Sequence, residues 1–154
     1  MNIRPALDAT SLLPGSFLRW FDARGWTPRP HQLELLAKAR AGRSVLLIAP
    51  TGGGKTLAGF LPSLVELHAQ DGDGKRASNR RLTSTGRGIG REGGLHTLYI
   101  SPLKALAVDI ARNLERPVAD MALPIRIETR TGDTSASQRQ RQRRDPPHIL
   151  LTTP

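Results

Sequence analysis

The sequence contains no cysteine, which excludes disulfide bonds and thiolate metal sites. Its longest clean apolar run, Val45–Ala49, is far too short to cross a membrane. The N-terminal residues show no apolar stretch followed by a cleavage site, so no secretion signal is predicted. A cytoplasmic protein without a membrane partner is therefore the expectation.

The chain has little negative charge relative to its positive charge: 13 acidic against 23 basic residues, a net charge of +10. This balance indicates a polyanionic partner such as nucleic acid. Only four of the basic residues are lysine, however, and an arginine excess can reflect coding bias in a GC-rich genome. With 154 residues, 38% of them hydrophobic, the chain is long enough for one soluble domain with a core.

Hydrophobic periodicity predicts an alternation of helices and strands along the chain. Strands are expected at 44–49, 96–101, 125–130 and 148–153, and helices at 16–24, 31–41, 55–69, 103–114 and 134–144. Strands that alternate with helices are typical of an α/β fold with a parallel sheet and right-handed crossovers. The arginines of the last helix, Arg139, Arg141, Arg143 and Arg144, are spread around it and are expected to be solvated.

One segment departs from this rhythm. Residues 69–94 include seven glycines and only two large aliphatic residues, Leu82 and Ile89. Such a composition cannot bury enough apolar surface to become ordered, so we expect a disordered surface insertion. Contact of this segment with nucleic acid is the alternative.

The stretch Ala49–Thr56, APTGGGKT, carries the chemistry. It follows the strand expected at 44–49 and opens an amphipathic helix, the context in which a glycine-rich loop binds phosphate. The backbone N–H groups of Gly52, Gly53 and Gly54 are expected to cradle phosphates, with Thr51 steering the end of the preceding strand. Lys55 is expected to reach the terminal phosphates of ATP, and the hydroxyl of Thr56 to hold Mg²⁺. A glycine-rich turn with an incidental lysine is the alternative. Ala49 stands where the usual spacing has glycine, and a small residue suffices there.

Several stretches in a fixed order resemble motifs of the superfamily 2 helicases, the DEAD/DEAH-box group. The loop is similar to motif I, and Gly25–Pro28 with Pro30 and Gln32 is similar to the adenine-reading Q motif. Ser101–Leu106 resembles motif Ia, Thr131–Thr134 resembles the Thr-Gly-Asp element of the large helicase-related (Lhr) type, and Pro146–Pro154 resembles the approach to motif Ib. Within that type the chain is most similar to the ligase-associated DNA damage response DEXH-box helicases.

The resemblance implies a RecA-like P-loop domain and a set of site residues. Gln32 would hydrogen-bond adenine, since an amide offers a donor and an acceptor together. A nucleic-acid strand, DNA by this resemblance, would be gripped through its phosphates by Ser101, Pro102, Lys104, Thr131, Gly132, Asp133, Thr153 and Pro154. The family also implies an ATP-dependent helicase or translocase in DNA repair, with ligase or nuclease partners. Residues 1–43 would form N-terminal helices with the Q-motif-like segment, and 44–154 the first part of the ATP-binding domain.

The sequence contains no apolar strand that ends in Asp-Glu, the carboxylate pair that completes the Mg²⁺ shell in such ATPases. We therefore expect a RecA-like domain truncated after about its fourth strand, as an N-terminal fragment of a helicase. The 154 residues alone are expected to bind ATP and nucleic acid without hydrolysing ATP. Two alternatives remain: a non-catalytic nucleic-acid-binding P-loop module, and a P-loop phosphotransferase that acts on a small molecule.

Overall fold

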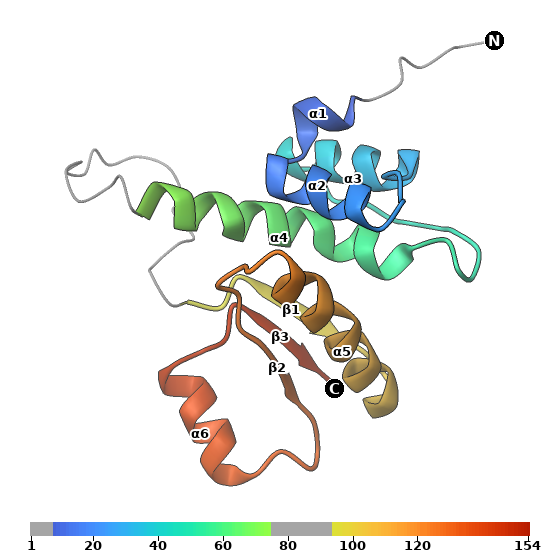
Figure 1. Cartoon of the computed structure of the whole chain (residues 1–154). Helices are drawn as coiled ribbons and strands as arrows, with labels where there is room; N and C mark the ends of the chain where they lie inside the picture. The colour runs from blue at the N-terminus through green and yellow to red at the C-terminus, as the bar shows by residue number, and fades with distance from the viewer. Residues whose placement is uncertain (1–7, 75–93) are drawn as a thin grey trace. The chain divides into compact units, whose positions relative to one another are not determined.

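The computed structural model describes residues 8–74 and 94–154. The chain divides into two compact units, Met1–Glu66 and Leu67–Pro154, which are drawn together in Figure 1 and considered separately below. Most of the glycine-rich segment 69–94 lies outside the described residues. Its first residues instead belong to a helix, because α4 runs on to Gly74. The division into 1–43 and 44–154 stays a prediction.

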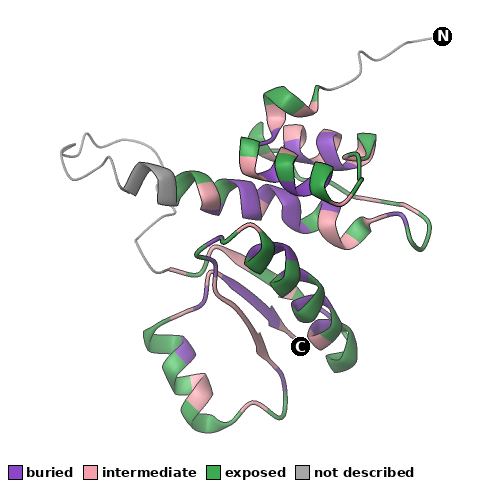
Figure 2. Cartoon of the chain, in the orientation of Figure 1, coloured by how far each residue is buried: buried purple, intermediate pink, exposed green. Residues whose placement is uncertain are grey.

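The first unit is built from helices. They are α1 (Ala9–Leu12), α2 (Gly15–Ala23), α3 (Pro30–Arg40) and the larger part of α4 (Lys55–Gly74). α2 buries Phe17, Trp20 and Phe21, which lie on one helical face as their spacing predicts. Figure 2 shows buried residues on each of the three longer helices. Three of the four helices were predicted within a few residues, and the short α1 was not predicted.

Three helices of the chain end in the same way. After α2, α3 and α5 (Lys104–Asp120), the residue two positions beyond the helix has a positive φ: Gly25 at 63°, Gly42 at 68° and Ala122 at 49°. In each case the next residue donates a backbone hydrogen bond back into the last turn, as Leu123 N does to Val118 O at 2.9 Å. This is the Schellman arrangement, in which glycine is the usual residue because it adopts positive φ without strain.

The strand expected at 44–49 is not formed, and this prediction was wrong. The segment has no regular secondary structure, and the side chains of Leu46 and Ile48 are 84% and 86% exposed. Its apolar composition suggested a buried strand, but a strand exists only through hydrogen bonds to a neighbouring strand. Local composition does not determine that pairing.

The second unit contains a parallel sheet of three strands in the order β1-β3-β2 (Figure 1). The strands are β1 (Thr97–Ile100), β2 (Ile127–Arg130) and β3 (Ile149–Thr152), each within its predicted range. The register aligns the last residues of all three strands, Ile100, Thr152 and Arg130. The loops that follow the strands therefore leave from one edge of the sheet.

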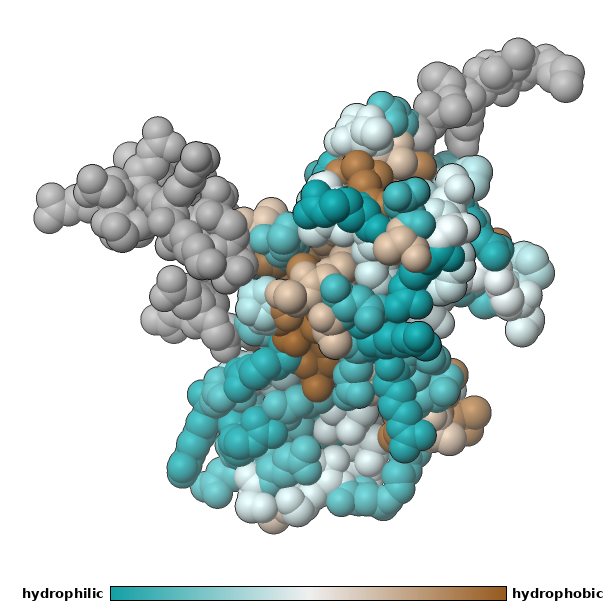
Figure 3. Space-filling model, viewed as in Figure 1, coloured by the Kyte–Doolittle hydropathy of each residue, from teal (hydrophilic) through white to brown (hydrophobic). Residues whose placement is uncertain are grey.

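Two helices accompany this sheet. α5 contacts β2 and β3, and it buries an apolar face that includes Ala107, Ile110 and Leu114. α6 (Ala136–Arg144) is strongly polar, and its one buried residue is Gln142. The surface over α6 is correspondingly hydrophilic in Figure 3. Because α6 has almost no apolar face, it needs polar contacts to stay against the sheet.

Candidate nucleotide-binding loop and nucleic-acid interface

The glycines of the loop Ala49–Thr56 occupy positions that disfavour larger residues, through backbone conformation or through close contacts. Gly52 and Gly54 have φ values of 77° and 72°, which favour glycine. A Cβ on Gly53 would lie 2.9 Å from Pro50 O and 3.5 Å from the Cβ of Ala49. The loop is therefore tightly folded at Gly53, where an added side chain would press on Pro50 and Ala49.

The ammonium group of Lys55 lies over this loop. Its Nζ donates to Ala49 O at 2.7 Å and to Pro50 O at 2.8 Å. Lys55 is also the first residue of α4, where backbone N–H groups lack partners within the helix. A cation and a helix N-terminus thus converge on one glycine loop, which is the donor set that suits a polyphosphate. The residues present fit the triphosphate of ATP.

Gln32 is the second candidate residue that the structure brings to this loop. Its side chain is buried, and its Oε1 accepts from Arg29 N at 2.9 Å. Its Nε2 donates to Gly54 O at 3.4 Å. A Cβ on Gly54 would lie only 2.9 Å from that nitrogen. The Q-motif-like segment and the phosphate loop are therefore in direct contact, although they are far apart in the sequence.

The two remaining residues predicted for the nucleotide site are Thr51 and Thr56. Thr51 is exposed in the turn that opens the loop, and Thr56 is half-buried in the first turn of α4. Among the described residues, no side-chain hydrogen bond of Thr51 or Thr56 marks a role toward a ligand. In the part of the chain that the structure describes, no group of three or more acidic or histidine side chains could hold a metal ion.

The parallel sheet brings the residues predicted for nucleic acid to one edge. Ser101 follows β1, Thr131 follows β2, and Thr153 follows β3, in strands that are adjacent in the sheet. Ser101 N donates to Thr152 O at 2.9 Å, and Thr152 Oγ1 donates to Arg130 O at 2.7 Å. These bonds tie the three strand ends together. Pro154 follows Thr153 in the chain.

The segment after β1 is held by its serine. Ser101 is buried, and its Oγ accepts from Leu103 N at 3.2 Å and donates to Leu103 O at 3.1 Å. Pro102 is exposed beside it. The serine hydroxyl thus shapes the turn into α5, so in this structure its contacts are internal.

Lys104, the first residue of α5, forms an ion pair with Asp133 of the loop after β2. The pair joins the two segments that resemble motif Ia and the Thr-Gly-Asp element. Both side chains are largely exposed. The Thr131 N–H donates to Thr134 Oγ1 at 2.9 Å, and Thr134 N donates back to Thr131 O at 3.1 Å, so this loop is a closed turn. Gly132 and Asp133 lie exposed at its tip.

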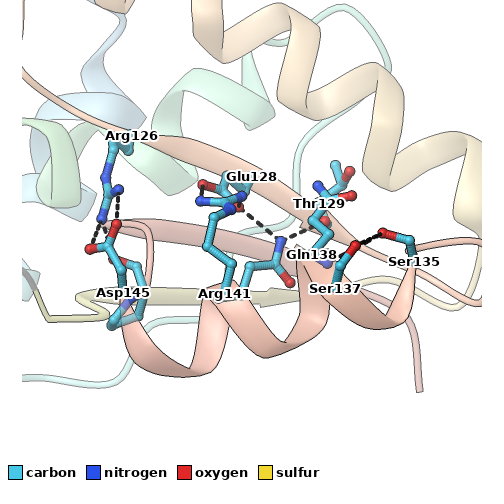
Figure 4. Close-up of polar contacts among 10 residues, drawn as sticks. Arg126, Glu128, Thr129, Ser135, Ser137, Gln138, Arg141 and Asp145 are labelled. Atoms are coloured by element: carbon cyan, nitrogen blue, oxygen red, sulfur yellow. Dashed lines mark hydrogen bonds and ion pairs between the residues drawn. The ribbon is translucent and has the colours of Figure 1, made fainter.

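The arginines of α6 are not simply solvated, and this prediction was wrong for two of them. Arg141 forms a bidentate ion pair with Glu128 of β2, at 2.9 and 2.7 Å (Figure 4). Arg139 donates to Thr131 O at 3.0 Å and to Gly132 O at 2.9 Å. Charge spacing gave no sign of these contacts, because the partners are distant in the sequence.

Two further residues, Gln142 and Asp145, complete the attachment of α6. Gln142 donates to Glu128 Oε2 at 2.9 Å and to Thr129 O at 3.1 Å. Just beyond the helix, Asp145 pairs with Arg126 at 2.6 and 2.7 Å (Figure 4). The side chain of Arg141 beside Glu128, together with the Gln142 bond, lowers the pKa of that carboxyl. α6 is therefore attached to β2 by charge-assisted hydrogen bonds in place of an apolar face.

The ring of His148 links the residues that directly precede β2 and β3. Its Nδ1 accepts from Arg126 N at 2.9 Å, which requires that nitrogen to be unprotonated. Burial is the main reason that the pKa of His148 is lowered, and the nearby Arg126 adds to the effect. The structure therefore favours the neutral imidazole.

A glycine loop that leads into a helix, and parallel strands whose loops gather at one edge, define an α/β protein of the P-loop class. Within the described residues, no helix is long and apolar enough to cross a membrane. The family model for the DEAD/DEAH box helicases matches residues 29–154. The chain belongs to this helicase family.

Among curated proteins, the chain is 38% identical to the "Lhr helicase/uracil glycosylase" of Escherichia coli over 161 residues, which cover 96% of the chain and 10% of that protein. It is 39% identical to the "ATP-dependent helicase Lhr-Core" of Methanocaldococcus jannaschii, over 88% of the chain and 16% of that protein. The chain thus spans a tenth to about a sixth of the length of these two relatives.

Solved structures agree with this relationship. The helicase Lhr of Mycobacterium smegmatis, bound to ssDNA and AMP-PNP, matches with a TM-score of 0.71 and 32% identity, over 92% of this chain and 17% of that one. The DUF1998 helicase MrfA bound to DNA and AMPPNP matches with a TM-score of 0.67 and 28% identity, with the same coverage. The predicted resemblance to Lhr-type helicases and the predicted RecA-like fold class are confirmed.

Proposed function

We propose that the chain forms the ATP-binding part, and one DNA-contacting part, of an ATP-dependent DNA helicase or translocase of the Lhr type that serves DNA repair. The contact between Gln32 and the phosphate loop at Gly54 carries the nucleotide half of this proposal. It is supported by relatives of this chain whose structures contain AMP-PNP and DNA.

In this proposal each residue of the loop has one task. Gly52, Gly53 and Gly54 present backbone N–H groups to the phosphates, and Lys55 exchanges the carbonyls of Ala49 and Pro50 for phosphate oxygens. ATP supplies the phosphoanhydride whose hydrolysis drives movement. The hydroxyl of Thr56 would hold Mg²⁺, Thr51 would shape the entry to the loop, and Gln32 would hydrogen-bond the adenine edge.

The DNA half of the proposal rests on the edge formed after the three strands. The candidates there offer hydroxyls, backbone N–H groups and one lysine, which suit phosphates and do not distinguish bases. They are Ser101, Pro102, Lys104, Thr131, Gly132, Asp133, Thr153 and Pro154. The ion pair with Asp133 keeps Lys104 at this edge, where its ammonium group is available to a phosphate.

The 154 residues contain no Asp-Glu pair after an apolar strand, and we propose that by themselves they bind ATP without turning it over. The test is a titration of the chain with a fluorescent ATP analogue, followed by an assay for released phosphate. Binding that is lost in Lys55→Ala, without turnover, supports the proposal. Steady hydrolysis that Lys55→Ala abolishes would contradict the proposed inactivity.

Adenine recognition is tested separately. Gln32→Ala is expected to reduce the preference for ATP over GTP, because the amide would no longer match the adenine edge. Glu34→Ala is the matched control, since Glu34 lies on the same helix and forms an ion pair with Lys38, one turn along that helix. Equal loss of ATP and GTP binding in Gln32→Ala would instead assign Gln32 a purely structural task at the loop.

A further inference from the structure

Arg139 reaches from α6 to the loop that follows β2. One nitrogen of its guanidinium, Nη2, donates to Thr131 O at 3.0 Å and to Gly132 O at 2.9 Å. Two consecutive carbonyl groups therefore point at the same atom. This contact fixes the orientation of the two peptide planes at the tip of the loop.

A planar trans peptide holds its N–H group opposite to its C=O group. The chain has no cis peptide bond among its described residues, so the N–H groups of Gly132 and Asp133 are directed away from Arg139. The neighbouring N–H groups of Thr131 and Thr134 are both used inside the turn. Within the part of the chain that the structure describes, those of Gly132 and Asp133 donate to no protein atom. Two successive free N–H groups on an exposed loop suit an anion.

The charges around the loop favour the same ligand. Arg139 donates only to carbonyl groups, and no carboxylate of the described residues forms an ion pair with it. Its positive charge therefore stands behind the two peptide groups and is not neutralised locally. The one carboxylate at the loop, Asp133, is paired with Lys104, which offsets the repulsion that it would exert on a phosphate.

We propose that Arg139 is a positioning residue for nucleic-acid binding: it turns the Gly132 and Asp133 amides outward to receive one backbone phosphate of a single-stranded DNA. This inference rests on the proposed function, because it deepens the DNA-contacting edge. Arg139 does not touch the strand itself. It acts through the loop, which distinguishes it from a surface arginine that pairs with phosphate directly.

The direct test follows the amide signals of the 154-residue chain by NMR while a thymidine oligonucleotide is added. The signals of Gly132 and Asp133 are expected to shift together and to saturate with the rest of the binding isotherm. Oligonucleotide binding that leaves both signals in place overturns the inference. This arm needs no variant, so it stands even if a substitution at position 139 prevents folding.

The second test measures oligonucleotide affinity against salt for Arg139→Met, which keeps much of the side-chain stem, and for Arg143→Met. Arg143 is exposed on the same helix, so it controls for the loss of one nearby charge. Arg139→Met is expected to bind about tenfold more weakly than Arg143→Met, the size of a lost charge-assisted hydrogen bond. Arg139→Lys restores a cationic donor and is expected to recover most of that loss.

The salt dependence separates positioning from direct contact. Loss of a direct phosphate contact lowers the slope of log affinity against log salt by about 0.7 for a single strand. Arg139→Met is expected to keep the slope of Arg143→Met, and a slope lower by that amount would overturn the inference. Lys104→Ala tests the proposed function itself. If this variant binds DNA with the affinity of the unchanged chain, the edge after the three strands is not the DNA-binding site. If Lys104→Ala weakens binding and Arg139→Met matches Arg143→Met, only the inference fails.

Discussion

The side-chain nitrogen of Gln32 lies 3.4 Å from the carbonyl oxygen of Gly54, so the first helical segments and the phosphate loop meet at one point. Gly54 also begins the hydrogen bonding of α4, because its carbonyl accepts from Ala58 N at 3.0 Å. A change at Gly54 therefore acts on the loop, on the helix start and on Gln32 together.

Gly54→Ala is expected to abolish ATP binding, because the new Cβ would lie 2.9 Å from the Gln32 nitrogen in a backbone that already has positive φ. Gly52→Ala is the matched variant: its φ is equally positive, but a Cβ there meets nothing within 4 Å. Titration with a fluorescent ATP analogue is expected to show a milder loss for Gly52→Ala. Equal losses would mean that the contact with Gln32 has no part in binding.

Ala122→Gly is expected to stabilise the protein by about 1 kcal/mol, since Ala122 adopts a positive φ that costs L-residues energy. The reverse changes, Gly25→Ala and Gly42→Ala, have open space around the new Cβ and are expected to cost about the same amount. Urea unfolding measures all three. An Ala122→Gly protein that is no more stable than the original would show that the helix end relaxes without strain.

His148 is expected to make stability depend on pH. Its folded-state pKa is lowered, so its contribution is fully present above about pH 6.5, the ordinary value of histidine, and is lost as pH falls through the lowered pKa. Protonation would remove the acceptor for Arg126 N. His148→Asn keeps an acceptor without titrating, and thermal melting from pH 7.5 to 5 is expected to show a smaller decline for it. Parallel declines would assign the pH dependence to other groups.

Arg141→Met is expected to lower the melting temperature at neutral pH more than Arg143→Met does, because Arg141 holds Glu128 and Arg143 is exposed. The lowered pKa of Glu128 means that the pair contributes above about pH 4.5 and is lost as pH falls through the folded value. The two variants should therefore converge once the pH lies below the folded-state pKa of Glu128. A difference that persists there would point to lost packing of the arginine stem instead.

The sequence predicted most helices, the three paired strands and the family, because these follow from local periodicity and from motif order. It failed at 44–49, where strand formation depends on pairing that the local residues do not encode. The prediction from sequence also failed at Arg139 and Arg141. A run of arginines has the same spacing whether its side chains are solvated or form hydrogen bonds with a neighbouring β-strand and its loop. Contacts such as Arg141 with Glu128 join residues that only the fold brings together.

The loop glycines and Lys55 were predicted from their spacing and from their place between an expected strand and a helix. The strand is not formed, but the geometry of the glycines and of Lys55 fits the prediction. Gln32 needed the resemblance, since a single glutamine at a helix start carries no chemical signal by itself. Its contact with Gly54 depends on the tertiary structure and cannot be inferred from the local sequence. The roles of these residues toward ATP stay predictions.

The central claim is that residues 32 and 49–56 form one ATP site. The most direct measurement follows the backbone amide signals of the chain by NMR while Mg·ATP is added, with Lys55→Ala in parallel. The account predicts saturable shifts at Gly52, Gly53 and Gly54 and at the Gln32 side-chain amide, and their loss in the variant. Shifts confined to other residues, or an unchanged response in Lys55→Ala, would contradict it.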